Sequence, residues 1–90
     1  MDGYANPVEA AMGSMPVGIT HVVEVDEKAG GENVYVLLAV EVTGYGFYLD
    51  ENLCERAEDG SWWPGSSAGG GFTDRTLADL RAHPPPQGLA

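Results

Sequence analysis

The sequence predicts an α+β fold, in which an antiparallel β meander of three or four strands carries short N- and C-terminal helices. A Val-rich segment over residues 34–43 has the composition of a strand, and Gly-rich and Asp-Gly turns separate it from neighbouring strand-like segments. Helix-capping residues stand near both ends of the chain. A small all-β sandwich or open barrel is the main alternative. We assign residues 1–83 to a single domain and residues 84–90 to a Pro-rich extended or disordered tail.

The first elements are a short helix and a strand. Asn6 is a good N-cap, Pro7 suits the first helical position, and Gly13 can adopt the left-handed conformation that stops a helix. Residues 19–25 then alternate like a strand, and the charges and Gly30-Gly31 that follow favour a loop over residues 26–33.

The strongest strand spans Val34 to Thr43. Its even positions are apolar, and its odd positions are apolar over the first half. A strand that is apolar on both faces is usually central in its sheet, with both faces covered. The short helices are candidates for covering one face and a second subunit for the other, which leaves homodimerisation open.

The third strand is expected over Phe47 to Arg56. Asp50 and Glu51, near its middle, indicate a bulge or a solvent-facing stretch. After the Asp59-Gly60 turn, Trp62 and Trp63 begin a short return strand that Pro64 ends. Because adjacent residues of a strand face opposite ways, only one tryptophan can lie in the core.

The last third of the chain is expected to hold a loop and a helix. Residues 65–71, Gly-Ser-Ser-Ala-Gly-Gly-Gly, have the composition of a flexible loop. Thr73 or Asp74 can cap a final helix that runs to about His83, with Leu77 and Leu80 as its apolar stripe. The three prolines from Pro84 onward stop that helix.

The charge distribution limits the function classes. The formal net charge is −10, and residues 1–60 hold all of it, because two Asp and two Arg balance one another in the remainder. A strongly negative surface repels phosphate backbones and anionic lipids, so neither nucleic acid nor a membrane is an expected partner. It suits a basic protein partner, or it serves solubility alone.

Cysteine use and the N-terminus point to the cytoplasm. Cys54 is the only cysteine, so no intrachain disulfide can form, which fits a reducing compartment. The first residues, Met-Asp-Gly-Tyr, do not resemble a signal peptide, and the longest apolar run, residues 34–40, is too short to span a bilayer.

No set of residues points to catalysis, a metal or a cofactor. The glycine run at residues 65–71 lacks the lysine of a phosphate-binding loop, and Cys54 lacks an electropositive setting that would activate it with His21 as base. His21 and His83 are too far apart in sequence to suggest a metal site. Glu41, late in the most apolar strand, is the acid for which burial and a raised pKa are worth testing.

Aromatic residues give the best indication of a binding surface. Tyr and Trp are frequent anchors at interfaces, although in so small a domain they also fill cores. The candidate partner-binding residues are four aromatic residues with three neighbouring acids: Tyr45, Tyr48, Trp62, Trp63, Asp50, Glu51 and Glu55.

Three segments carry a family resemblance: Leu-Cys-Glu-Arg, then Glu-Asp-Gly-Ser-Trp, then Gly-Ser-Ser-Ala-Gly-Gly-Gly-Phe-Thr. With the valine-rich strand before them, they resemble a group of small, uncharacterised actinobacterial proteins over about the C-terminal two-thirds of the chain. The resemblance implies a β-rich fold and a high-GC bacterial source, and it brings no activity with it.

The sequence favours a protein-binding module, such as an inhibitor, immunity protein or accessory subunit, acting through an acid-rimmed aromatic surface. One alternative is a small ligand-binding domain or enzyme with a pocket between sheet and helix. Another is a structural protein that assembles through a sheet edge.

Overall fold

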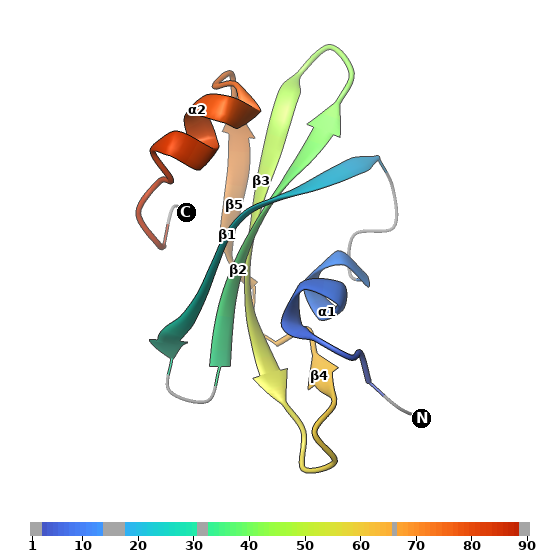
Figure 1. Cartoon of the computed structure of the whole chain (residues 1–90). Helices are drawn as coiled ribbons and strands as arrows, with labels where there is room; N and C mark the ends of the chain where they lie inside the picture. Colours follow the sequence, from blue (N-terminus) through green and yellow to red (C-terminus); the bar gives the residue numbers. More distant parts are fainter. Residues whose placement is uncertain (1–2, 14–17, 31–32, 66, 89–90) are drawn as a thin grey trace.

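The computed structural model describes residues 3–13, 18–30, 33–65 and 67–88, and shows an antiparallel sheet with two short helices (Figure 1). This confirms the predicted α+β class. The elements in chain order are α1 (Pro7–Gly13), β1 (Ile19–Gly30), β2 (Asn33–Val42), β3 (Gly46–Arg56), β4 (Trp62–Trp63), β5 (Ser67–Thr73) and α2 (Leu77–Ala82). No described helix is long and apolar enough to cross a membrane.

The sheet begins as the predicted meander. β1 pairs with β2 and β2 with β3, all antiparallel. β4 and β5 then both pair with the remaining edge of β3, β4 at residues 55–56 and β5 at residues 47–52. β2 is therefore interior, as its two apolar faces predict.

The fifth strand corrects the sequence interpretation. The glycine run expected to be a flexible loop lies largely within β5, whose residues pair with β3 from Phe47↔Thr73 to Asn52↔Ser67. Strand formation here depends on this long-range pairing, since glycine has little intrinsic preference for strands. The register shifts between Glu51 and Asn52, but the extra residue, Ala68, belongs to β5, and β3 itself pairs regularly with β2, so the bulge predicted in β3 is not found there. Residue 66, in the same run, lies outside the described residues.

The first strand also differs from expectation. β1 continues to Gly30, through residues expected to form a loop, and its register with β2 shifts twice, between Val22 and Glu24 and between Asp26 and Gly30. These bulges let the charged segment stay paired with β2 without keeping strict alternation. Gly31, predicted as part of the turn, lies outside the described residues.

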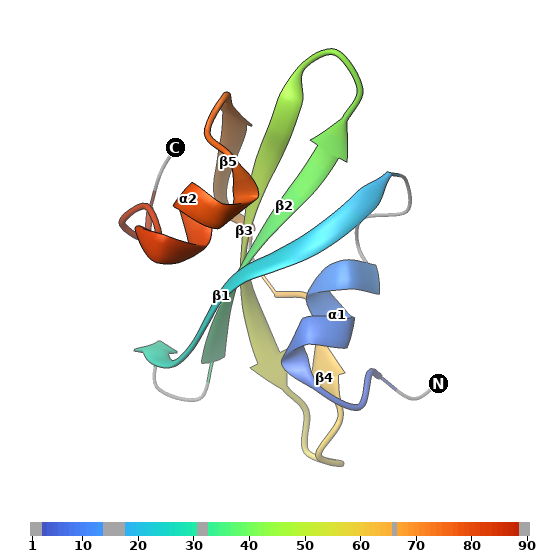
Figure 2. The ribbon, with the colours of Figure 1, turned by 45° about the horizontal axis from the view of Figure 1, so that its top comes forward.

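The two helices cover opposite faces of the sheet (Figure 2). Ala10 and Ala11 of α1 pack against Val34, Val36, Leu38 and Cys54 on one face. Leu80 of α2 packs against Tyr35, Leu37, Ala39 and Leu49 on the other. The alternation of β2 thus supplies both clusters, and the face considered for a second subunit is covered by the chain's own α2.

Capping residues set the ends of the helices. The Asn6 side-chain oxygen accepts a 2.9 Å hydrogen bond from the Glu9 amide, as a predicted N-cap should. The N-cap of α2 is Thr76, whose hydroxyl accepts a 3.1 Å bond from the Asp79 amide. The expectation of Thr73 or Asp74 as the cap is wrong because Thr73 belongs to β5.

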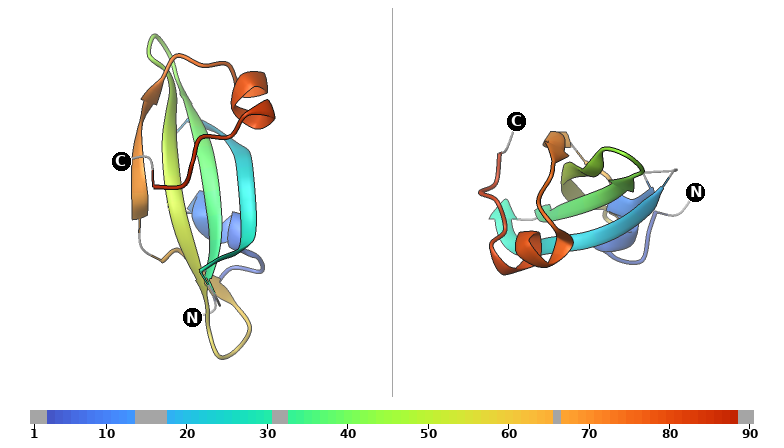
Figure 3. Two further views of the ribbon diagram at one scale, coloured as in Figure 1. Left: turned by 90° about the vertical axis from the view of Figure 1, so that its left-hand side faces the viewer. Right: turned by 90° about the horizontal axis from the view of Figure 1, so that it is seen from above.

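The chain after α2 lies against the sheet rather than away from it. Residues 84–88 belong to no helix or strand and cross the face that α2 covers (Figure 3). Pro85 is buried, Gln87 Nε2 donates a 2.7 Å hydrogen bond to Asp26, and the Gly88 amide donates a 2.8 Å bond to Glu51. Residues 89–90 lie outside the described residues.

Candidate partner-binding surface

Three aromatic rings gather on one face of the sheet at the β2–β3 turn. Tyr45 lies in that turn, Tyr48 on β3 and Phe72 on β5. The ring centroids of Tyr48 and Phe72 are 5.1 Å apart, and those of Tyr45 and Phe72 are 6.0 Å apart. We call these three residues the aromatic patch.

Strand register explains why the rings meet. Tyr48 and Phe72 are directly opposed in the β3–β5 pairing, and Tyr48 also opposes Val40 of β2. Directly opposed residues of antiparallel strands bring their side chains together on one face. α1 packs farther along this face, over Val34 to Leu38, so the aromatic patch lies beyond the helix.

The aromatic patch is largely open to solvent. Tyr45 is 73% exposed and Phe72 is 60% exposed, while Tyr48 is half-buried between neighbouring strands. Sequence reasoning selected both tyrosines but missed Phe72, because a residue in a supposed glycine loop has no assigned face. Reading Ser67–Thr73 as a strand paired with β3 would have placed Phe72 beside Tyr48.

The two predicted tryptophans lie apart from the aromatic patch, on β4. Trp62 is partly buried against the cluster under α1, and the Arg56 guanidinium lies 5.9 Å from the centre of its ring. Trp63 is 37% exposed. The strand alternation therefore turns one tryptophan, Trp62, toward the core, and the pair does not join the two tyrosines in a single surface.

The three predicted acids have different environments. Asp50 lies two residues from Tyr48 on the same face of β3, and its carboxylate accepts a 2.8 Å hydrogen bond from Asn52 Nδ2. Glu55 is exposed and opposes Trp63, so it belongs with the tryptophans. Only Asp50 of these acids adjoins the aromatic patch within the described part of the chain.

Glu51 is not at the surface, and the expected solvent-facing stretch is wrong at this position. Its relative exposure is 0%, because strand alternation turns it toward the face covered by α2 and residues 84–88. There it accepts hydrogen bonds from the Tyr35 hydroxyl at 2.5 Å and from the Gly88 amide at 2.8 Å. Asn52 is also buried. A buried carboxylate needs such donors, so Glu51 has a structural role in this state.

Burial falls on a different acid from the one selected in the sequence. Glu41 is about half exposed, and its carboxylate lies 3.1 Å from His21 Nε2 on the neighbouring strand. Among the acids that the structure describes, Glu51 is the one that is fully buried. Its partner Tyr35 responds to this environment: burial, the hydrogen bond to Glu51 and the negative charges of Glu51 and Glu24 raise the pKa of Tyr35 far above its usual range. Tyr35 therefore stays protonated and remains a donor.

The residues considered for chemistry are not arranged for it. Cys54 is buried, and this burial raises the pKa of its thiol. Its Sγ donates a 3.4 Å hydrogen bond to the Pro7 carbonyl oxygen. A protonated, enclosed thiol is a poor nucleophile. Among the residues that the structure describes, no group of three His, Cys, Asp or Glu side chains is placed to hold a metal ion.

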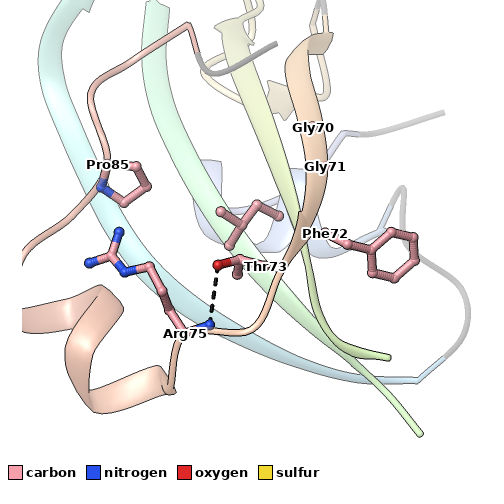
Figure 4. Close-up of a pocket in the computed structure, with 7 residues that line it drawn as sticks. Gly70, Gly71, Phe72, Thr73, Arg75 and Pro85 are labelled. Atoms are coloured by element: carbon pink, nitrogen blue, oxygen red, sulfur yellow. Dashed lines mark hydrogen bonds between the residues drawn. The ribbon is translucent and has the colours of Figure 1, made fainter. Parts of the chain in front are cut away.

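A pocket of about 250 Å³ lies on the face opposite the aromatic patch, beside β5 (Figure 4). Its lining comprises Leu49, Gly70, Gly71, Phe72, Thr73, Arg75 and Pro85. The Phe72 ring points away from it, so Phe72 contributes backbone. Arg75 is the one charged lining residue, and its guanidinium donates to the Asp79 carboxylate and to the His83 carbonyl. The lining combines the side chains of Leu49 and Pro85 with glycine backbone and with the polar residues Thr73 and Arg75.

Comparisons with protein-family models, curated proteins and solved structures find no match to this chain. The candidate site therefore rests on the chain's own geometry.

Proposed function

We propose that this protein is an acidic protein-binding module that recruits a basic protein partner through the aromatic patch. The observation that carries the proposal is the contact among Tyr45, Tyr48 and Phe72 on an uncovered part of the sheet, with two of the rings mostly exposed. Single exposed apolar side chains are common on protein surfaces, whereas contiguous exposed rings are typical of interaction sites.

The charges of the chain favour a basic partner. The formal net charge is −10, and the described arginines are each engaged within the chain. Arg75 pairs with Asp79, Arg81 donates to the Val22 carbonyl, and Arg56 lies over the Trp62 ring. Exposed acids such as Glu55 and Glu58 therefore carry negative charge that attracts and orients a positively charged protein.

The aromatic patch is chemically suited to cationic side chains. The faces of Tyr and Phe rings attract Lys and Arg, and Asp50 on the same face adds a carboxylate beside Tyr48. The buried, reduced Cys54 is compatible with the reducing cytoplasm, which we propose as the compartment.

The experiment compares capture of partners by three immobilised forms of the full chain. These are the wild type, a Tyr45→Ala/Phe72→Ser variant, and an Ile19→Ala control. Ile19 has the same 60% exposure as Phe72 but lies on β1, at the other edge of the sheet. Lysate of the source organism is applied at low salt, and retained proteins are quantified by mass spectrometry as salt is raised.

We expect a basic protein that the wild type and the Ile19→Ala control retain, that the double variant loses, and that salt releases. Retention of the same proteins by all three forms contradicts the proposal, as does retention of no protein by the wild type.

A further inference from the structure

One edge of β5 is open. β5 pairs with β3 along one edge, and no described strand pairs with the other (Figures 1 and 3). The outward N–H and C=O groups of such a strand are able to pair with another extended chain. The open edge lies next to the aromatic patch, because Phe72 is a residue of β5 itself.

The opposite edge of the sheet is built differently. β1 contains two register shifts and the charged residues Glu24, Asp26 and Glu27, and the Arg81 guanidinium donates to its Val22 carbonyl at 3.0 Å. Bulges and charges of this kind discourage pairing with another strand. β5 has one register shift of its own, between its pairs with Glu51 and Asn52, but no charged residue and no proline over Ser67–Thr73. The β5 edge is thus less protected than the β1 edge, most of all over Gly69 to Thr73, where its pairing with β3 is regular.

The two sides of β5 offer different surroundings to alternate residues of an added strand. Phe72, opposite Tyr48, faces the aromatic patch. Gly71 and Thr73, opposite Leu49 and Phe47, face the other side, where the pocket lies (Figure 4). A Cβ atom added at Gly71 would meet no atom within 4 Å, which shows that the space above this position is open.

We propose that an extended basic segment of the partner protein adds to the open edge of β5 as a further strand. This inference rests on the proposed function and specifies its mode of recognition. Because side chains of a strand alternate between faces, Lys or Arg at every second position lies over the aromatic patch near Asp50. The residue between them points into the pocket, where Leu49 and Pro85 suit a small aliphatic side chain.

Charge decides between a foreign segment and a second copy of this chain. Two copies each carry a net charge of −10, so their approach is opposed by repulsion, whereas a basic segment is attracted. Backbone hydrogen bonds along the edge supply affinity, and the alternation of a cationic with an aliphatic side chain supplies specificity.

The first test uses a capped peptide of alternating lysine and valine, seven residues long to match β5. Its binding to the full chain is followed through the backbone amide signals of β5. Two further peptides carry N-methyl groups on all valine amides or on all lysine amides, so that each lacks the donors of one edge. We expect saturable binding of the parent and about tenfold weaker binding of at least one methylated peptide, since two or three hydrogen bonds are lost.

The outcomes separate this inference from the proposed function. Equal affinity of all three peptides, or no binding of the parent, overturns strand addition. Capture of a partner that depends on Tyr45 and Phe72 would in that case still support the proposed function. Loss of both results would remove the two proposals together.

A variant of the pocket side provides the second test. Gly71→Leu places a side chain in the open space above Gly71 and is not expected to lower the unfolding midpoint. We expect it to weaken peptide binding about tenfold through the blocked pocket, while Ile19→Ala leaves binding unchanged. Unchanged affinity of Gly71→Leu overturns the pocket assignment. A wild-type dimer in sedimentation analysis that Gly71→Leu dissociates would assign the edge to a second copy instead.

Discussion

The Tyr35 hydroxyl on β2 donates a hydrogen bond to the Glu51 carboxylate on the neighbouring strand β3. In the β2–β3 pairing, Tyr35 lies opposite Leu53, and Glu51 lies opposite Leu37. The 2.5 Å hydrogen bond therefore joins diagonal neighbours on the same face of the sheet. Diagonal neighbours of this kind are within reach of a long aromatic side chain. The bond places a carboxylate inside a cluster that is otherwise apolar, and it makes the stability of that face depend on polar partners.

Tyr35→Phe is expected to destabilise the protein by about 1–3 kcal/mol, because the buried Glu51 carboxylate loses a donor while the packing of the ring is kept. The measurement is urea denaturation. Tyr45→Phe, which removes a hydroxyl from a residue that is 73% exposed, is the matched control and should change stability little. Equal stability of the two variants would contradict the structural role of the bond.

The raised pKa of Tyr35 predicts a loss of stability at high pH. In the unfolded chain Tyr35 ionises near its ordinary value of 10.0, whereas in the folded chain burial and Glu51 keep it protonated to higher pH. The contribution of the protonated Tyr35 hydroxyl to the free energy of unfolding is therefore complete below about pH 10. Above that pH it declines by up to about 1.4 kcal/mol per pH unit. Urea denaturation at several pH values between about 9 and 11 measures this loss of stability. Tyr35→Phe should reduce this slope and leave the part that comes from the raised pKa of the Cys54 thiol, whereas an unchanged slope in the variant would assign it to other groups.

Deletion of residues 84–90 is expected to destabilise the sheet face that α2 covers. It removes the buried Pro85 and the Gly88 amide that donates to Glu51, at a cost of about 1–3 kcal/mol. The control is Gln87→Ala, which removes only an exposed hydrogen bond to Asp26 and should cost less than about 0.5 kcal/mol. Thermal unfolding compares them, and equal melting temperatures for the deletion and the wild type would show that this segment adds no stability.

Two adjacent glycines of β5 should respond oppositely to alanine. A Cβ atom at Gly70 would lie 2.7 Å from the Leu49 carbonyl oxygen and 2.6 Å from the Tyr48 hydroxyl, so Gly70→Ala must disturb the strand pairing. At Gly71 the added methyl group meets open space, and Gly71→Ala should stabilise the fold by about 0.4–1 kcal/mol through a more restricted unfolded chain. Denaturation midpoints that shift in the same direction for both variants would argue against the assigned faces of β5.

Cys54 should resist modification in the folded protein. Its burial and raised pKa leave little accessible thiolate, so alkylation by iodoacetamide at pH 8 should be at least about tenfold slower than in the unfolded chain. The same protein in urea provides the control rate, since the chain has no other cysteine. Equal rates in both states would show that the strand end at Cys54 opens readily.

Local sequence patterns were sufficient to predict the central strand, the Asn6 cap and the opposite orientations of the two tryptophans. Each depends on residues adjacent in sequence: alternation over β2, a side chain accepting from an amide three residues on, and neighbours on opposite faces of β4. These signals persist whatever the rest of the chain does.

The remaining features depend on contacts between distant segments. β5 is a strand because β3 lies beside it, and its glycines carry no local signal for that state. Glu51 looks like a solvent-facing acid in sequence and is buried because α2 and residues 84–88 cover its face. Phe72 was missed for the same reason, since its position beside Tyr48 follows from the register of β5. Two of the three residues of the aromatic patch, Tyr45 and Tyr48, were therefore visible in the sequence.

The position of β2 between two hydrophobic clusters determines how the protein loses its structure. Val34, Val36 and Leu38 belong to one cluster, and Tyr35, Leu37 and Ala39 to the other, so a single backbone segment supports both. If β2 becomes disordered, both clusters lose the side chains that it contributes. We therefore expect the two clusters to lose their structure together, in a single cooperative transition.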